Sequence, residues 1–200
     1  MAFIGIKVPH EVGRLLKKIE VDGEKVPDSE YHITIAMFGD EWPVSEAAKT
    51  LEVTFETLKN FKPFKVKTKK ISCFPGGDNG VPVFAKVESD ELHEINDELK
   101  KAYDKEGIEF SKIHKEFKPH ITLSYADKKI DEEEIEDIEF IVHEVVIWAG
   151  DNGDNRFFIT FPLDNIKKSY VISKTDLFYK LALSSTEYFR KTCERRKVPR

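Results

Sequence analysis

Cysteine is scarce in this sequence, with only Cys73 and Cys193 among 200 residues. Two cysteines cannot build a disulfide framework or a cysteine-rich zinc site, and their scarcity favours a reducing compartment. Long apolar runs are also missing, since no segment approaches the roughly 20 apolar residues of a membrane span. The opening MAFIGIKVPHEV shows no basic leader before such a run. We therefore expect a cytoplasmic protein that does not enter a membrane.

A basic excess is missing from most of the chain. Residues 164–200 carry ten Lys and Arg against four Asp and Glu, a net charge of +6. Residues 1–163 carry the remaining 22 basic and 33 acidic residues, a net charge of −11. Tight, sequence-independent binding of long duplexes depends on neutralising phosphates, so the acidic body argues against it. A small or single-stranded substrate is the better match.

The order of apolar and polar residues predicts strands and helices in mixed order. Strands are expected at 3–8, 31–38, 64–74, 81–87, 117–125, 140–148 and 156–161. Helical spacing predicts three helices. The first follows Pro9 and has an apolar face of Val12, Leu15, Leu16 and Ile19. The second is capped by Ser45, with Ala48, Leu51, Phe55 and Leu58 on one face, and the third lies between Ser89 and Gly107, with Leu92, Ile95, Leu99, Ala102 and Tyr103. The acidic run DEEEIED at 131–137 is expected to be a solvated helix face or a loop.

The tripeptide His-Ile-Thr occurs twice, beginning at His32 and at His120. The composition predicts roughly 0.3 His-x-Thr pairs by chance, so two copies need an explanation. Each copy lies in an expected strand, where successive side chains alternate between faces. Each histidine therefore shares a face with the threonine two residues later, and Ser124 would extend that face in the second copy.

The order strand, helix, His-Ile-Thr strand is repeated over residues 3–38 and 81–125. Hairpins containing GDNG follow at 77–80 and 150–153. We therefore predict an α+β fold in which two similar lobes, related by an approximate two-fold axis, surround a central groove. Residues 1–163 would form this domain, and 164–200 a basic, helical extension. That arrangement would bring His32 and His120 together.

A pair of imidazoles can divide acid and base roles near neutral pH. Cleavage of a phosphodiester needs both roles, because the attacking hydroxyl or water loses a proton and the departing oxygen gains one. Hydroxyls of Thr34 and Thr122 could hold the non-bridging phosphate oxygens between the two rings. This scheme requires no metal and no other cofactor.

The stretches FIGIKVP, YHITIAMFGD and FKPHITLSY resemble the two-histidine phosphoesterases with HxTx motifs, the superfamily that contains the LigT-like RNA 2′,3′-cyclic phosphodiesterases once named 2′-5′ RNA ligases. The resemblance covers about residues 3–161. It implies the bilobal LigT-like fold, with two antiparallel sheets and flanking helices around a central cleft. It implies catalytic roles for His32 and His120, as acid and base in that order, and phosphate binding by Thr34 and Thr122.

The resemblance leaves the substrate open. It admits RNA ends with 2′,3′-cyclic phosphate, 2′-5′ linkages and small signalling nucleotides, including the cyclic or 2′-5′ oligonucleotides that some viral relatives destroy in host defence. A non-catalytic module that binds RNA or nucleotides is an alternative of a different class. We expect a monomer whose partner is an RNA end or a small nucleotide.

Other residues have competing interpretations. Trp42 and Tyr125 are candidates for stacking on a base near the groove, with packing as the alternative. Lys65, Lys67 and Lys69 would share one strand face, either protecting an edge or solvent face or contacting phosphate. Trp148 is expected in the core.

The remaining histidines lack the motif spacing. His10, His93, His114 and His143 are expected in solvated or structural roles. A metal site with His114, His120 and nearby acids would make the protein a metal-dependent hydrolase, but the clustered spacing of metal ligands is missing. The basic tail is expected either to dock as a helix or to contact nucleic acid or a protein partner.

Overall fold

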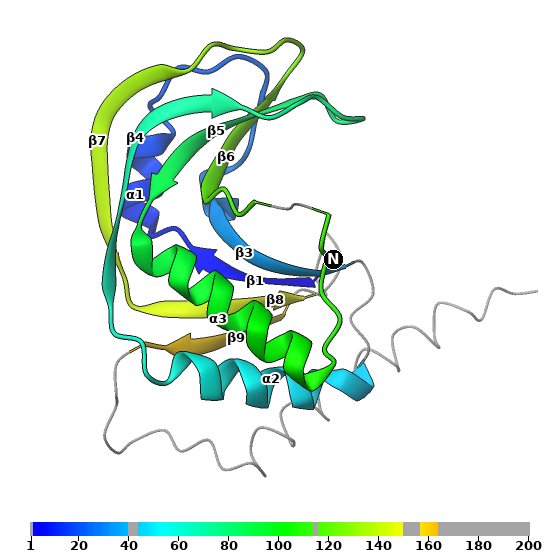
Figure 1. Cartoon of the computed structure of the whole chain (residues 1–200). Helices are drawn as coiled ribbons and strands as arrows, with labels where there is room; N and C mark the ends of the chain where they lie inside the picture. Colours follow the sequence, from blue (N-terminus) through cyan, green and yellow to red (C-terminus); the bar gives the residue numbers. More distant parts are fainter. Residues whose placement is uncertain (1, 40–43, 114–115, 150–156, 164–200) are drawn as a thin grey trace, which may run out of the picture.

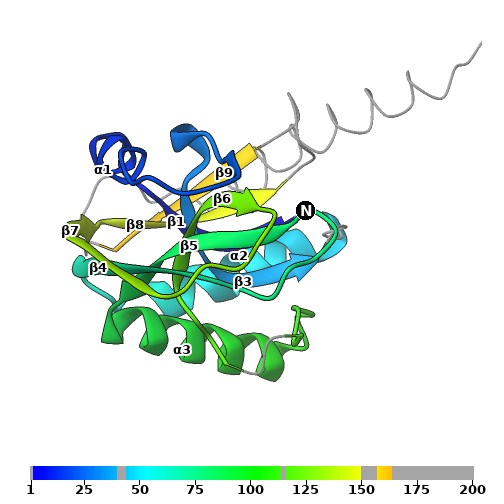
Figure 2. The same ribbon diagram turned by 90° about the horizontal axis from the view of Figure 1, so that it is seen from above.

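The computed structural model describes residues 2–39, 44–113, 116–149 and 157–163 (Figure 1). Two antiparallel sheets and three α-helices lie within these ranges, and Figure 2 shows them from above. The four-stranded sheet has the order β3 (His32–Gly39), β1 (Ala2–Lys7), β8 (Glu144–Ala149), β9 (Phe157–Pro162). The five-stranded sheet has the order β2 (Glu24–Lys25), β6 (His120–Ala126), β5 (Val81–Glu88), β4 (Phe64–Cys73), β7 (Glu133–Val142). The predicted α+β class with two antiparallel sheets is confirmed.

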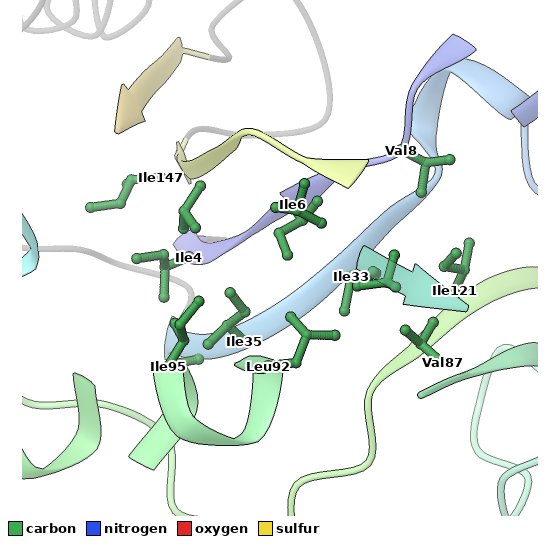
Figure 3. Packing of buried hydrophobic residues seen from close by; sticks show 14 of the residues in the cluster. Ile4, Ile6, Val8, Ile33, Ile35, Val87, Leu92, Ile95, Ile121 and Ile147 are labelled. Atoms are coloured by element: carbon green, nitrogen blue, oxygen red, sulfur yellow. The ribbon is translucent and has the colours of Figure 1, made fainter. Parts of the chain in front are cut away.

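One apolar core joins the two sheets to the helices α2 (Val44–Leu58) and α3 (Asp90–Glu106). Ile33 on β3 and Ile121 on β6 are both fully buried in it. Figure 3 shows side chains from β1, β3, α3, β5 and β6 gathered in this region. The motif strands therefore rest on one continuous core.

The sheets have similar strand orders. In each, the His-Ile-Thr strand pairs with the first strand of its repeat, β3 with β1 and β6 with β5. The next strand inward is β8 in one sheet and β4 in the other. The two GDNG hairpins do not occupy equivalent places, however. One joins β4 to the interior strand β5, whereas the other precedes the edge strand β9, and its turn lies outside the described residues.

The chain crosses from one sheet to the other at His143. A single strand over 140–148 was the prediction, and it is wrong, because β7 ends at Val142 in the five-stranded sheet and β8 begins at Glu144 in the four-stranded sheet. His143 and Glu144 are both exposed, so the alternation of faces is interrupted there. The carbonyl of His143 accepts a hydrogen bond from Leu163 N at 2.8 Å, which ties the crossing to the end of β9.

Helix α3 follows the sequence prediction closely. Its cap Ser89 accepts a hydrogen bond from Leu92 N at 3.4 Å, and Gly107 ends it in the left-handed conformation at φ 67°. Such a φ favours glycine, which has no Cβ to clash. The buried stripe contains Leu92, Ile95 and Leu99, as expected.

The other helices depart from their predicted faces. Helix α1 (His10–Leu16) ends before Ile19, and Leu15 is exposed. Helix α2 begins at Val44, so the predicted cap residue Ser45 lies inside its first turn. The buried face of α2 contains Thr50 and Thr54, whereas Phe55 is exposed. Thr54 Oγ1 donates to Thr50 O at 2.6 Å, which allows a threonine to replace an apolar residue in the core.

The acidic run contributes to strand β7, so the prediction of a helix face or loop is wrong for residues 133–137. The lysines of β4 are paired with carboxylates of this run, with Glu139 further along β7 and with Glu88 on β5: Lys65 with Glu139, Lys67 with Asp137, Lys69 with Glu88 and Lys70 with Glu132. Opposite charges on neighbouring strands favour this pairing. Because β4 is an interior strand between β5 and the edge strand β7, its lysines protect no edge, and their carboxylate partners disfavour the phosphate-contacting alternative.

Candidate active site

The strands β3 and β6 have the same pattern of burial. His32 and Thr34 are partly exposed on β3, and His120 and Thr122 are partly exposed on β6. The intervening isoleucines are fully buried. Each motif therefore has its histidine and threonine on one face and its isoleucine in the core, as the alternation predicts. Strands β3 and β6 also contact each other, which places both motifs at the junction of the two sheets (Figure 1).

Both motif strands carry a β-bulge directly after the threonine. In β3 the pairing shifts from Gly5–Thr34 to Ile4–Ala36, which leaves Ile35 as the extra residue. In β6 the pairing shifts across Leu123 in the same way. A bulged residue leaves the ladder, so its carbonyl needs another donor. Asn96 Nδ2 supplies it to Ile35 O at 2.6 Å, and Val26 N supplies it to Leu123 O at 2.9 Å.

The bulge changes the predicted role of Ser124. The alternation predicted Ser124 on the face of His120, but it is fully buried, and its hydroxyl donates to Asp22 O at 2.7 Å. Tyr125 follows it and is 38% exposed. The extra residue in β6 shifts the alternation of faces by one position. Tyr125, and not Ser124, is therefore the exposed residue.

Both histidine rings are anchored at Nδ1. His32 Nδ1 lies 2.7 Å from Glu30 O, and His120 Nδ1 lies 2.7 Å from Lys118 O. A carbonyl only accepts, so each Nδ1 carries the proton that it donates. In the neutral ring the basic nitrogen is therefore Nε2, on the opposite side from the anchored Nδ1. The two rings therefore share the same anchor, and Nε2 is the basic nitrogen of both.

Aromatic rings support His32. Its ring stacks on Phe3 with 4.8 Å between centroids, and Trp148 lies 5.4 Å away in a tilted arrangement. Gly5, opposite Thr34, makes room for this packing. A Cβ at Gly5 would lie 2.4 Å from Ile33 O and 3.3 Å from the Phe3 ring. Trp148 is 7% exposed, which confirms its predicted burial.

A different aromatic pair supports His120. Phe74 meets its ring edge-on at 4.7 Å, Phe84 lies at 5.3 Å, and the two phenylalanines stack at 4.2 Å. Phe3, Phe74 and Phe84 were missed as site residues. Register would have indicated Phe84, which pairs with Thr122, but cross-strand register is not readable from the sequence.

The other predicted residues are either outside the described ranges or exposed away from the motif spacing. Trp42 and His114 are outside the described residues. His10, His93 and His143 are exposed. Within the described ranges, no three His, Cys, Asp or Glu side chains come together as a metal-binding group. Of the helices described, none has both the length and the apolar character needed to cross a membrane.

A separate pocket of about 320 Å³ contains neither motif. It is lined by Glu20, Val21, Asp22, Lys25, Ile71, Ile130 and Glu133. Three carboxylates against one lysine disfavour a phosphate there. The motif strands are therefore the better candidate site for an anionic substrate.

Comparison with known proteins identifies the family and the fold. The family model described as the 2′-5′ RNA ligase superfamily matches residues 9–154. The crystal structure of TT0787 from Thermus thermophilus is similar with a TM-score of 0.66 at 21% identity, covering 81% of this chain and 97% of that one. E. coli LigT complexed with 3′-AMP gives 0.59 at 17% identity, covering 82% and 94%. The complex of LigT with NADP+ gives 0.58 at 17% identity, again covering 82% and 94%. Among curated protein sequences, none matches.

Proposed function

This chain belongs to the 2′-5′ RNA ligase superfamily, and on that premise we propose that it is a metal-independent phosphodiesterase. Its substrates would be 2′,3′-cyclic phosphates or 2′-5′ bonds in RNA ends or small nucleotides. Membership of the superfamily supports phosphodiesterase-type activity. The LigT complexes with 3′-AMP, NADP+ and ATP support a nucleotide as the ligand.

The observation that carries the proposal is the identical preparation of two histidines on contacting strands. Each ring donates from Nδ1 to the carbonyl two residues earlier, and each is followed by a partly exposed threonine on the same face. A purely structural histidine would not need the same anchor, the same neighbour and the same bulge in both halves of the chain. Two rings with Nε2 as the reactive nitrogen form the acid–base pair that the reaction needs.

The proposed mechanism takes His32 as the acid and His120 as the base, the order that the family resemblance implies. Neutral His120 takes a proton at Nε2 from the attacking water, whose oxygen bonds to phosphorus. Protonated His32 gives its Nε2 proton to the departing 2′ or 3′ oxygen as the P–O bond breaks. One water is added across one P–O bond, and the exchanged protonation states are restored through solvent. Thr34 and Thr122 donate hydroxyl hydrogen bonds to the non-bridging oxygens, where negative charge develops.

Tyr125 is the proposed contact for a base. Its ring is exposed at the end of β6, five residues after His120. Aromatic rings stack on bases without requiring a particular base. Base stacking by Trp42 also stays a prediction. The expectation of a monomeric, cytoplasmic protein is a separate prediction.

A panel of substrates tests the proposal. It should contain nucleoside 2′,3′-cyclic phosphates, 2′-5′- and 3′-5′-linked oligonucleotides, and cyclic di- and trinucleotides, each assayed with and without chelator. We expect chelator-insensitive cleavage of a 2′,3′-cyclic or 2′-5′ substrate that is lost in His32→Ala and in His120→Ala. Activity that disappears with chelator, or that survives in both variants, would overturn the proposal.

A further inference from the structure

A row of rings crosses the four-stranded sheet, beginning at His32. Phe3 on β1 stacks on His32 at 4.8 Å, Trp148 on β8 stacks on Phe3 at 5.3 Å, and Phe158 on β9 meets Trp148 edge-on at 4.8 Å. Phe3 is paired with Trp148 in register, and Trp148 with Phe158, so these three rings lie on one face. Phe3 and Trp148 are buried, whereas Phe158, the last member of the row, is 49% exposed.

A lysine accompanies this row. Lys7 is the cross-strand partner of His32, and its Nζ lies 5.9 Å from the centroid of the Phe158 ring. Lys7 is exposed. No carboxylate among the described residues forms an ion pair with it, whereas all four lysines of β4 have such partners. An aromatic face and an ammonium that no described carboxylate pairs with therefore lie together, continuous with the candidate site.

Among its described residues, the other lobe has no such pair beside its histidine. Lys86 is the cross-strand partner of His120, as Lys7 is of His32. Lys86 lies opposite Lys70. Both lysines lower the pKa of Glu132, mainly through the hydrogen bond from Lys70 and to a smaller extent through the charge of Lys86. The charge of Lys86 is thus partly compensated. The phenylalanines of this lobe pack against His120 itself.

We infer that Phe158 and Lys7 form a subsite for a second nucleotide of the substrate. The base would stack on the exposed face of Phe158, and the phosphate that links it to the reacting nucleotide would face the Lys7 ammonium. Stacking on an aromatic ring tolerates any base, and a lysine binds phosphate as a point charge. The inference rests on the proposed function and specifies its substrate as single-stranded RNA of two or more nucleotides.

Paired substrates test the subsite. A nucleoside 2′,3′-cyclic phosphate is compared with a 3′-5′-linked dinucleotide that ends in the same group. We expect Phe158→Leu to raise KM about tenfold for the dinucleotide, within the range of base–aromatic stacking, and to leave KM for the mononucleotide unchanged. Phe158→Trp, which retains an aromatic face, should keep the preference for the dinucleotide. Equal effects on both substrates, or no effect on either, would overturn the inference.

The lysines give a matched control. Lys7→Gln should raise KM for the dinucleotide and weaken its dependence on salt, because one phosphate contact is lost. Lys86→Gln, at the equivalent position of the other lobe, should not change the preference between the substrates. Equal effects of the two lysine variants would overturn the assignment of the subsite to this lobe.

Binding separates this inference from the proposed activity. In a His120→Ala, Trp42→Phe background Trp148 is the only tryptophan, and it contacts Phe158. Dinucleotide binding that quenches its fluorescence should be lost on adding Phe158→Leu. If the wild type cleaves nothing but this loss is seen, the subsite stands and the phosphodiesterase proposal fails. If cleavage is seen and binding is unaffected by Phe158→Leu, the subsite is overturned.

Discussion

The two lobes are alike at their motif strands and unlike in the rings beside them. His32 and His120 have the same Nδ1 anchor, the same threonine two residues later and the same bulge after it. Their surroundings differ. His32 begins an aromatic row that ends at the exposed Phe158, whereas His120 is packed against Phe74 and Phe84.

This difference corresponds to the chemistry of the proposed reaction. The reaction at phosphorus needs one acid and one base, and two similar imidazole rings can provide them. The two sides of a phosphodiester are not alike, because one oxygen departs with one group while the other oxygen stays. We therefore expect the near-symmetric residues to control turnover and the asymmetric residues to control substrate choice.

Single replacement of each histidine is the strongest test of this comparison. We expect His32→Ala and His120→Ala each to lower kcat by about 10²- to 10⁴-fold, the range of general acid–base catalysis. The wild-type profile should be bell-shaped in pH. A base must be neutral to act, so His120→Ala should flatten the acidic limb. An acid must be protonated, so His32→Ala should flatten the alkaline limb.

Circular dichroism and thermal unfolding provide the control for the histidine variants, which should stay folded because both rings are partly exposed. If His120→Ala instead flattens the alkaline limb of the pH profile and His32→Ala the acidic limb, His120 is the acid and His32 the base. Wild-type kcat in either variant would contradict the shared reaction.

The threonines test the symmetry with a smaller effect. Thr34→Val and Thr122→Val remove a hydroxyl while keeping strand propensity and shape. We expect each to lower kcat/KM by about 10²-fold, at the low end for loss of one oxyanion donor. Thr→Ser at either position keeps the hydroxyl and should stay near wild type. A loss in only one of the valine variants would show that one motif alone binds the phosphate.

The two bulges differ in the groups that donate to their carbonyls. The donor to Ile35 O is the side chain of Asn96, which a substitution can remove, whereas the donor to Leu123 O is the backbone N–H of Val26. Asn96→Leu keeps the approximate volume but removes the donor to the buried Ile35 carbonyl. We expect a loss of about 2 kcal/mol in the free energy of unfolding, the range for an unsatisfied buried group. Urea unfolding at constant m measures it.

Ser124→Ala is the control for Asn96→Leu, since Ala36 occupies the equivalent position in β3. It removes one hydrogen bond to Asp22 O and should cost about 1 kcal/mol without lowering kcat. If Asn96→Leu proves no more destabilising than Ser124→Ala, the bulge does not depend on Asn96.

The equivalent helices α1 and α3 differ in a buried tyrosine. Tyr103 on α3 lies 2.7 Å from Thr54 Oγ1 on α2, so Tyr103→Phe should cost about 1 kcal/mol at neutral pH. Burial raises the pKa of Tyr103 above its ordinary value of 10.0. The unfolded chain therefore ionises first, and stability that is present below about pH 10 declines as the pH rises beyond it.

Tyr103→Phe should remove that decline, so the advantage of the wild type should shrink above about pH 10. Urea unfolding at about pH 8 and about pH 11 measures the change. Tyr31, whose pKa is raised by burial and then by Asp28, remains in both proteins and cancels in the difference. An advantage that does not change with pH would contradict the argument.

Much of the fold was predictable because its signals are local. Alternation identified the strands, and Ser89 and Gly107 marked the ends of α3. The break at His143 was not predictable, because two adjacent apolar strands read as one when their partners are unknown. The acidic strand β7 was missed because its charges are stabilised by lysines of β4, which are distant in the sequence.

The candidate site was predictable in its motif and not in its surroundings. The doubled His-Ile-Thr named four residues, and period-two alternation gave their faces. The bulges, which turn Ser124 inward and leave Tyr125 exposed, depend on pairing with β1 and β5. The rings beside each histidine depend on the same register, which only the folded sheets specify.

The crossing of the chain between sheets also constrains when the protein can fold during synthesis. Ala2 pairs with Ala149, so β1 lacks its inner neighbour until almost the whole described chain has left the ribosome. Strand β4 similarly waits for β7. Such distant pairings slow folding, and unpaired strands are prone to associate with other chains. Nascent chains should therefore expose an unpaired side of β1 until β8 emerges.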